Sequence, residues 1–422
     1  MKKNSKTNQD QGYVYDACVI GAGASGLVCG AVLARRGMNT LIIEQNKKSG
    51  RKLYATGNGK CNLANAVISD SAYYANGFAG SVVTEGSALL LHRYLEQAGI
   101  PLTEKNGYYY PQSLQASSVV WALTDGAKLA GCEFQYETEV YGIERTPEGG
   151  FLLKTRTTGK DAGEEGTVLC NRLVLAMGSP AAPHLGSGKE EVISTLLEDL
   201  GLGYQPFEPA LCPLEVAEDV SSLAGVRVRA RISIGLAMDR PGFGEDLMEE
   251  GEVMLTEYGL SGIVIFNMST MIQKGEQVSV DLLPLWEDEG KWLEFVHAQE
   301  KKRTLFGILN GMLHEKLCRY FIEKRFEEKA AKRPVSTFSD EELLDLFRNL
   351  KDWRLTVTGK KADMGQACRG GVLTQLLSPD TLQVRQDPRI AVTGELTQVT
   401  GRCGGYNLMY ALISGIRAGQ RL

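Results

Sequence analysis

The stretch VIGAGASGLVCGAVLARRGMNTLIIE, Val19–Glu44, places three glycines in the spacing G-x-G-x-x-G between two recognisable patterns. Residues 17–20 form an apolar run that predicts a strand, and Leu27, Ala31 and Ala34 follow with helical spacing. A strand, a tight turn and a helix in this order are typical of a dinucleotide-binding fold. The stretch therefore indicates an α/β domain that holds a nucleotide.

Each glycine of the turn has its own physical reason. Gly21 permits the tight turn, and Gly23 has no Cβ that would keep a pyrophosphate away from the main chain. Gly26 lets the helix pack closely against the strand. The first turn of the helix then offers free N–H groups and the positive end of its dipole to the phosphates.

A second apolar run, residues 40–43, ends at Glu44. A carboxylate at this position accepts hydrogen bonds from both hydroxyls of an adenosine ribose, and it disfavours a 2′-phosphate. We therefore expect the tightly held nucleotide to differ from NADP. We also expect Glu44 to lie outside the core.

The overall composition is that of an ordinary globular protein. The chain has 422 residues, 43% hydrophobic and 23% charged, which is enough for two or three domains. Its formal net charge of -5 gives no indication of nucleic-acid binding. The N-terminal tail lacks an apolar signal segment, and no run is long enough to span a membrane, so we expect a cytoplasmic protein without a membrane partner.

Cysteine and histidine residues give no sign of a metal or disulfide centre. The nine cysteines contain no C-x-x-C pair, and the four histidines are not clustered. Most of the cysteines are expected to be buried, reduced side chains. We expect no metal.

Shifts in pattern along the chain indicate an interrupted nucleotide-binding domain. Short β-like runs begin after Gly203, a charged helical region begins at Trp286, and strand and helix signals return after Gly370. The predicted parts are a first nucleotide-binding part at 1–203, barrel parts at 204–285 and 351–366, a helical subdomain at 286–350, and a second nucleotide-binding part at 367–422.

The C-terminal part indicates which cofactor is bound. An apolar strand at residues 390–392 precedes the turn Gly394-Glu395, and the pair Gly404-Gly405 opens a helical run. In flavoproteins with two dinucleotide-binding domains, such a helix points its N-terminus at the pyrimidine end of the flavin, where its dipole stabilises negative charge on the reduced ring. The alternative is that the glycine pair is only a loop.

Seven motifs carry a family resemblance. They are, in order, GAGASGL, GRKLYATGNGKCNLAN, GYYYPQSLQAS, LTEYGLSG, VDLLP, QACRGGV and GRCGGYNLMYALISG. The chain resembles, from about Val14 to Gly419, the BaiN-like flavoproteins, also called the aminoacetone-oxidase family of NAD(P)/FAD-dependent oxidoreductases. The resemblance implies a Rossmann-like FAD-binding domain made from both chain ends, with an inserted β-barrel and helical subdomain.

The resemblance also implies which residues bind FAD. Those near the adenosine and pyrophosphate would be Gly21, Gly23, Ala24, Ser25, Gly26, Glu44, Gln45, Arg51, Lys52 and Val140. Those near the flavin, its ribitol chain and the phosphates would be Gly57, Asn58, Cys61, Asn62, Ala176, Met177, Gly178, Gly394, Glu395, Gly404, Gly405, Tyr406, Asn407 and Leu408. The alternative for Arg51 and Lys52 is an exposed basic pair.

Two segments depart from the family pattern. The family usually has Ala-Thr-Gly-Gly where this chain has residues 176–179, Ala-Met-Gly-Ser, and it has an aspartate where Gln398 stands. The second change removes a negative charge beside the flavin phosphates. We expect FAD binding to persist, and the departures bear on how tightly FAD is held and on the substrate specificity.

The implied reaction is hydride transfer through FAD. The chain has no second strand-G-x-G-x-x-G-helix unit, so NAD(P)H would visit the flavin transiently, or the organic substrate would exchange hydride with it directly. An enone reductase of the bile-acid or steroid type is the favoured reaction, and an amine oxidase is an alternative. The expected partner is a small-molecule substrate, and the oligomeric state is left open.

Two tyrosines are candidate proton donors, because a phenol can protonate the carbanion formed when hydride reaches an enone. Tyr110 lies in the triplet before Pro111, and Tyr258 lies in TEYGLSG. Aromatic packing is the alternative role for both.

A different class of function rests on the basic residues between Lys301 and Arg333. They would dock RNA or another anionic partner in a flavin-dependent RNA-modifying or redox-sensing protein. Interleaved glutamates favour a solvated helix face instead.

Overall fold

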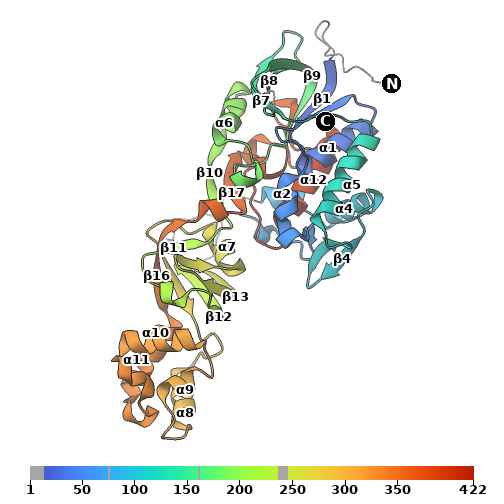
Figure 1. Cartoon of the computed structure of the whole chain (residues 1–422). Coiled ribbons are helices and arrows are strands. Elements are labelled where there is room, and N and C mark those ends of the chain that lie inside the picture. The colour runs from blue at the N-terminus through green and yellow to red at the C-terminus, as the bar shows by residue number, and fades with distance from the viewer. Residues whose placement is uncertain (1–13, 75–76, 160–161, 236–245) are drawn as a thin grey trace. The chain divides into compact units, whose positions relative to one another are not determined.

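The computed structural model describes residues 14–74, 77–159, 162–235 and 246–422 (Figure 1). Contacts within the chain divide it into two compact units. The first unit, called here the nucleotide unit, combines residues 1–208 with 367–422, and the second, called the inserted unit, comprises residues 209–366.

A mostly parallel sheet forms the centre of the nucleotide unit. Its strands run in the order β18-β19-β9-β1-β2-β6, and the central pairs from β19 to β6 are all parallel. Their bounds are β1 (Val14–Ile20), β2 (Thr40–Ile43), β6 (Glu133–Gln135), β9 (Glu165–Leu175), β18 (Gln383–Val384) and β19 (Asp387–Val392). The four residues of β2 are all buried, as expected for a parallel strand covered on both faces.

Two helices from opposite chain ends pack directly against each other beside this sheet. They are α1 (Ala24–Arg35) and α12 (Tyr406–Arg421), which Figure 1 shows side by side. A Cβ on Gly415 would overlap Ser25 O, and a Cβ on Gly419 would lie 2.8 Å from Cys29 O. Only glycine therefore permits this close approach of the two helices.

The remaining elements of the nucleotide unit surround this core. Its other helices are α2 (Arg51–Ala55), α3 (Phe78–Val82), α4 (Glu85–Gln97), α5 (Ala116–Leu129) and α6 (Glu190–Asp199). A small antiparallel sheet has the order β3-β5-β4, with β3 (Ala64–Asn65), β4 (Leu102–Lys105) and β5 (Tyr108–Pro111). Strand β7 (Thr138–Arg145) pairs with β8 (Phe151–Thr157), and β10 (Tyr204–Ala210) pairs with β17 (Ala367–Val372).

The inserted unit is a closed barrel with helices attached. The strand order is β11-β14-β13-β12-β15-β16. The bounds are β11 (Leu214–Val216), β12 (Arg227–Gly235), β13 (Asp246–Leu255), β14 (Gly259–Ser261), β15 (Gln277–Asp281) and β16 (Trp353–Lys360). The helices are α7 (Ile263–Ser269), α8 (Glu289–His297), α9 (Leu305–Leu309), α10 (Glu315–Arg325) and α11 (Asp340–Lys351).

One hydrophobic core joins the barrel to these helices. Trp292 of α8 is fully buried, and its ring lies 5.1 Å from that of Phe347 on α11. Trp353 at the start of β16 contacts Phe321 of α10 with ring centres 5.2 Å apart. The fold class predicted from the sequence, an α/β nucleotide-binding domain with an inserted barrel and helices, is confirmed.

Candidate functional site

The parallel sheet brings four of the predicted nucleotide-binding segments to one edge. Ile20 at the end of β1 lies in register with Ile43 of β2 and with Leu175 of β9. Leu175 in turn pairs with Val392, the last residue of β19. Because ligands of α/β sheets bind outside the carboxyl ends of the strands, this edge is the candidate cofactor site. The segments that leave it begin at Gly21, Glu44, Ala176 and Thr393.

The glycine turn after β1 fits a phosphate group. Gly21 has a φ of 104°, and a Cβ there would lie 2.6 Å from Ala176 O. A Cβ on Gly26 would overlap Gly21 O, whereas a Cβ on Gly23 would meet nothing within 4 Å. Gly23 caps α1 without a side-chain hydrogen bond, and the first turn that includes Ala24 carries no acidic residue. The N–H groups there are therefore available to an anion.

Glu44 has a more buried position than the sequence suggested. Its side chain is 8% exposed, so the expectation that it lies outside the core is wrong. Oε2 accepts from Ala22 N at 2.8 Å, and Oε1 accepts from Asn46 N at 2.9 Å and from Asn46 Nδ2 at 2.7 Å. Glu44 thus ties β2 to the glycine turn. A carboxylate has about four acceptor positions, so these bonds leave about one for a ribose hydroxyl.

The residues after Glu44 hold a distant loop that the sequence did not point to. Gln45 Nε2 and Asn46 Nδ2 donate to Gly186 O at 2.8 and 2.9 Å. Gly186 has a φ of 75°, which favours glycine there. The segment around Gly186 therefore covers the end of β2 where the adenosine is expected.

Lys52 and Glu395 meet although they are far apart in sequence. Lys52 Nζ donates to Ser179 O at 2.8 Å and to Glu395 Oε2 at 3.1 Å, while Glu395 Oε1 accepts from Cys368 N at 3.2 Å. A Cβ on Gly178 would lie 3.8 Å from Lys52 Nζ. Both side chains are partly buried, and the positive charge of Lys52 is balanced by the negative charge of Glu395. By contrast, the neighbouring Arg51 is exposed, as in the exposed-pair alternative.

Hydrogen bonds join the segment after α2 to the glycine pair before α12. Asn65 Nδ2 donates to Gly404 O at 2.9 Å. The Asn62 amide, oriented so that its bonds are satisfied, donates to Ala64 O at 2.9 Å and accepts from Gly405 N at 3.3 Å. Two motifs from opposite ends of the chain are thereby held together, as the implied flavin site requires.

The N-terminus of α12 also fits an electron-rich group. Gly405 caps the helix with a φ of 93° and no side-chain hydrogen bond, and the first turn carries no acidic residue. The Asn407 side chain is directed back to Gly401, with hydrogen bonds of 2.7 and 2.8 Å to its N and O atoms. The N–H groups of Tyr406, Asn407 and Leu408, the first three residues of this 16-residue helix, are therefore left without a side-chain partner among the described residues.

Alternation along β5 separates the three adjacent tyrosines. Tyr108 lies 2.9 Å from a Cβ placed on Gly404, and Tyr110 lies 3.7 Å from a Cβ placed on Gly57. Tyr109 instead stacks edge-on with the His92 ring at 4.5 Å. Tyr108 and Tyr110 therefore share the face of β5 that borders the predicted flavin segments. Burial, followed by the neighbouring Tyr108, raises the pKa of Tyr110, which keeps its phenol protonated.

Tyr258, the other predicted proton donor, lies in the inserted unit. Its hydroxyl donates to Met364 Sδ at 3.5 Å, and Lys361 Nζ lies 5.1 Å from its ring centre. Its approach to the flavin stays a prediction.

The other predicted residues fall into three groups. Gly57 and Asn58 adopt positive φ angles of 56° and 52° in the turn after α2. Val140 is buried in β7 opposite Thr155. Met177 follows β9, Gly394 follows β19, and Tyr406 and Leu408 lie in the first turn of α12.

Thiol and metal chemistry receive no support from the described part of the chain. Burial raises the pKa of both Cys61 and Cys368 to about 11, so both thiols are protonated at neutral pH. Among the described residues, no group of three metal-ligating side chains comes together. The helices in the described ranges are all too short or too polar to cross a membrane.

The chain has relatives of known activity along its whole length. Residues 15–421 match the family described as HI0933-like protein Rossmann domain. A 3-dehydro-bile acid delta(4,6)-reductase of Clostridium scindens is 32% identical over 416 residues, which cover 95% of this chain and 97% of the relative. A ribosomal RNA dihydrouridine synthase of Escherichia coli is 29% identical over 429 residues, covering 97% and 98%.

Among solved structures, a 3-ketosteroid-delta4-(5alpha)-dehydrogenase from Rhodococcus jostii is 15% identical with a TM-score of 0.48. That similarity covers 99% of this chain and 98% of the dehydrogenase. The similarity to the family and to both relatives extends through both units of the structure.

Proposed function

The chain belongs to the HI0933-like family and is an FAD-dependent oxidoreductase, and from this premise we propose that it reduces a carbon–carbon double bond conjugated to a carbonyl group. The resemblance to BaiN-like flavoproteins is confirmed by the same matches. The observation that carries the proposal is the 32% identity, over nearly the full length of both chains, to a bile acid enone reductase.

The names of the two relatives describe related chemistry. A 3-dehydro-bile acid with Δ4,6 unsaturation has its double bonds conjugated to a ketone. Dihydrouridine is uridine whose double bond conjugated to the C4 carbonyl has been saturated. Saturation of the Δ4 bond and of the uridine bond each adds a hydride to the carbon β to a carbonyl and a proton to the α carbon. Saturation of the Δ6 bond is the vinylogous addition, with hydride at the δ carbon and a proton at the γ carbon. This shared step supports enone reduction more firmly than any single substrate.

FAD, when bound, supplies the hydride, with NAD(P)H as its proposed donor. The chain's own residues have three tasks. The glycine turn before α1 binds the pyrophosphate, and Glu44 binds a ribose hydroxyl with its remaining acceptor position. The uncapped start of α12 stabilises negative charge on the flavin ring. Tyr110 or Tyr258 holds the proton that the α carbon receives.

The tyrosine assignment is tested with single substitutions and separated half-reactions. Tyr110→Phe and Tyr258→Phe each remove one phenol, and Tyr109→Phe is the control because Tyr109 packs on His92. We expect reduction of FAD by the nicotinamide to stay normal in all three. Reoxidation by a 3-keto-Δ4 steroid should slow about 10²- to 10⁴-fold in the variant that lacks the donor. Stopped-flow absorbance measures both steps, and equal reoxidation in all variants would assign both candidates to packing.

A second candidate function is reduction of uridine in RNA, favoured by the 29% identity to the dihydrouridine synthase. Charge pairing on the part of the inserted unit outside the basic stretch 301–333 opposes it. Arg227, Arg229 and Arg348 each form an ion pair with a glutamate, at 2.6, 2.9 and 2.7 Å. Cations neutralised in this way attract a polyanion less strongly. Two results would make RNA the proposed substrate in place of a steroid-type enone. The protein would be retained on heparin at physiological salt, and uridine-containing RNA would reoxidise the reduced protein.

An amine oxidase remains the third candidate. It is distinguished by the first half-reaction, because an amine would then reduce FAD in the absence of a nicotinamide.

A further inference from the structure

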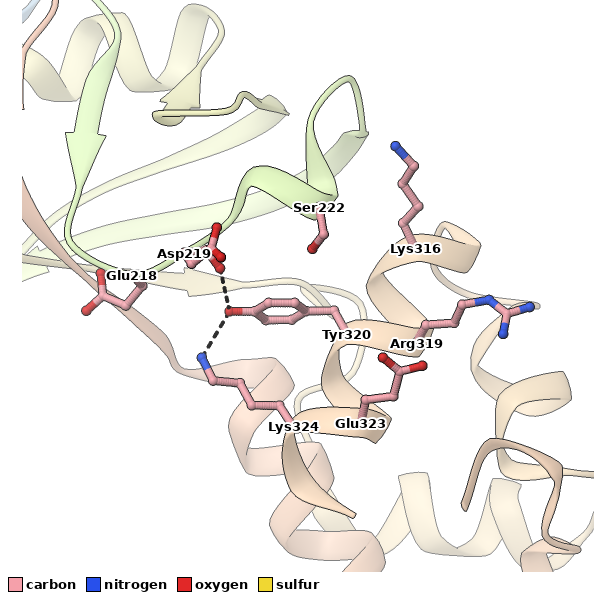
Figure 2. A pocket seen from close by; sticks show the side chains of 8 residues that line it. All are labelled: Glu218, Asp219, Ser222, Lys316, Arg319, Tyr320, Glu323 and Lys324. Carbon is pink, nitrogen blue, oxygen red and sulfur yellow. Dashed lines mark hydrogen bonds between the residues drawn. The ribbon is translucent and has the colours of Figure 1, made fainter. Parts of the chain in front are cut away.

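A recess in the inserted unit lies between one face of α10 and the segment 218–222. Its volume is about 600 Å³, within the range of small-molecule sites. Figure 2 shows Lys316 and Arg319 on one side of the Tyr320 ring, and Glu218 and Lys324 on the other. On α10, Lys316 and Arg319 are three residues apart and Tyr320 and Lys324 are four apart, spacings that place side chains on one helix face.

The recess is separate from the predicted proton donor of the same unit. Trp353, the first residue of β16, lies beside Tyr320 with ring centres 5.6 Å apart. Lys361 and Met364, which contact Tyr258, come just after the other end of β16. A strand of eight residues spans about 25 Å. The Tyr320 and Tyr258 rings therefore lie near different ends of β16, although Tyr258 O accepts from Val216 N at 3.1 Å, two residues before Glu218.

Two carboxylates beside the recess are already satisfied by their own neighbours. Glu218 accepts from Thr356 N at 2.8 Å and from Thr356 Oγ1 at 3.1 Å. Asp219 Oδ1 accepts from Ser221 N at 3.0 Å and from Ser221 Oγ at 2.6 Å. These bonds orient both acids, and within the described ranges neither acid forms an ion pair with Lys316 or Arg319.

The cations keep unused hydrogen-bond donors. Lys316 Nζ donates to Ala224 O at 3.0 Å, which leaves two of its three N–H groups. The guanidinium of Arg319 lies 4.8 Å from the Phe306 ring centre. Within the described ranges Arg319 donates no hydrogen bond, so all five of its N–H groups are available. The contact with Phe306 therefore holds the Arg319 guanidinium in place, while its N–H groups stay without a hydrogen-bond acceptor in the described part of the chain.

Tyr320 provides a fixed, flat surface between the two sides. Its hydroxyl accepts from Lys324 Nζ at 2.9 Å and donates to Asp219 O at 3.5 Å. Its ring also packs against Phe321 at 5.4 Å. A planar group of a ligand can stack on such a ring while an attached anion reaches the cations.

We propose that this recess binds a small ligand carrying a phosphate group, held by Lys316, Arg319 and Ser222. Arginine matches the geometry of a phosphate with paired N–H donors, and a lysine adds a second charge. The same recess contains Glu218, Asp219 and Glu323 beside its three cations. Those carboxylates repel a continuous polyanion, so a compact ligand fits better than RNA.

The test uses full-length, FAD-loaded protein and inorganic phosphate as the probe, at constant ionic strength set with chloride. Phosphate binding is measured by calorimetry for the wild type, Arg319→Gln and Lys316→Gln. The control is Lys301→Gln, which removes one exposed charge outside the recess. We expect the control to bind like the wild type and each recess variant to bind about tenfold or more weakly.

Melting temperatures show whether each variant is folded, and Lys316→Gln retains the Arg319 ring contact if Arg319→Gln unfolds. Equal affinity in all four proteins would overturn the proposal. The proposal would also be overturned if a single-stranded RNA displaced phosphate from the wild type and its binding required Arg319. The occupant of the recess would then be a polyanion. None of these outcomes depends on the reaction at the flavin.

Discussion

Replacing Glu44 by glutamine separates two roles that this carboxylate has in the structure. The substitution keeps the shape of the side chain but leaves one acceptor oxygen in place of two. At Glu44, Oε1 accepts from the N and Nδ2 atoms of Asn46, and Oε2 accepts from Ala22 N. A glutamine can keep both bonds from Asn46 only by turning its NH₂ group toward the N–H of Ala22.

The expected cost follows from this loss. One charge-assisted hydrogen bond is removed and a buried N–H group is left without its partner, which costs about 1.5 to 3 kcal/mol. Because Glu44 is 8% exposed, water cannot readily replace the lost acceptor. We therefore expect the free energy of unfolding of the apoprotein to fall by this amount. FAD affinity should fall in addition, because the acceptor for the ribose is also weakened.

Urea unfolding of the apoprotein and fluorescence titration with FAD measure the two effects separately. Glu96→Gln, at an exposed position of α4, is the matched control and should change neither. Full apoprotein stability together with weakened FAD binding would refute the structural role of Glu44. Loss of stability with unchanged FAD affinity would refute its contact with the nucleotide.

Three further substitutions test other parts of the account. Gly415→Ala should destabilise the protein by about 1 to 3 kcal/mol because its Cβ would overlap Ser25 O, whereas Gly126→Ala, in open space on α5, should be neutral or stabilising in the same urea assay. Asn65→Ala removes the bond to Gly404 O and should weaken FAD binding about 2- to 10-fold, and unchanged binding would mean that this bond does not position the glycine pair. Burial opposes ionisation of Asp387, but hydrogen bonds from Arg389 and Arg145 outweigh it and lower its pKa to about 2. Since the unfolded value is about 3.9, the stability from Asp387 is present above about pH 4 and is lost as the pH falls toward 2. Asp387→Asn should therefore be less stable at neutral pH and should lose less stability over that acid range, and parallel acid curves would contradict the assignment.

The sequence predicted the parts of the site that depend on local chain geometry. The glycine turn at Gly21–Gly26 follows from residue spacing alone, because the turn, the strand and the helix are contiguous. The glycine pair before α12 was also identified, through its place between a strand and a helix. The alternation of Tyr108, Tyr109 and Tyr110 could have been predicted as well, since side chains on a strand point to opposite faces in turn.

Contacts between residues far apart in the sequence could not be predicted from local patterns. Lys52 and Glu395 are 343 residues apart, and only the folded sheet shows that they pair with each other. The burial of Glu44 depends on Asn46 and on the loop at Gly186, which no local pattern connects. The Gln398 amide, where the family has an aspartate, donates to Gln205 Oε1 at 2.6 Å, a partner equally invisible in the sequence.

The central claim is that FAD in this protein passes hydride from a nicotinamide to an enone. The most direct measurement is the absorbance of the bound flavin in the purified wild-type protein under strictly anaerobic conditions. We predict that NADH or NADPH bleaches the flavin and that a 3-keto-Δ4 steroid restores its colour, with one equivalent of saturated ketone formed per FAD. A flavin that is bleached by an amine alone, or that stays reduced when the enone is added, would contradict the claim.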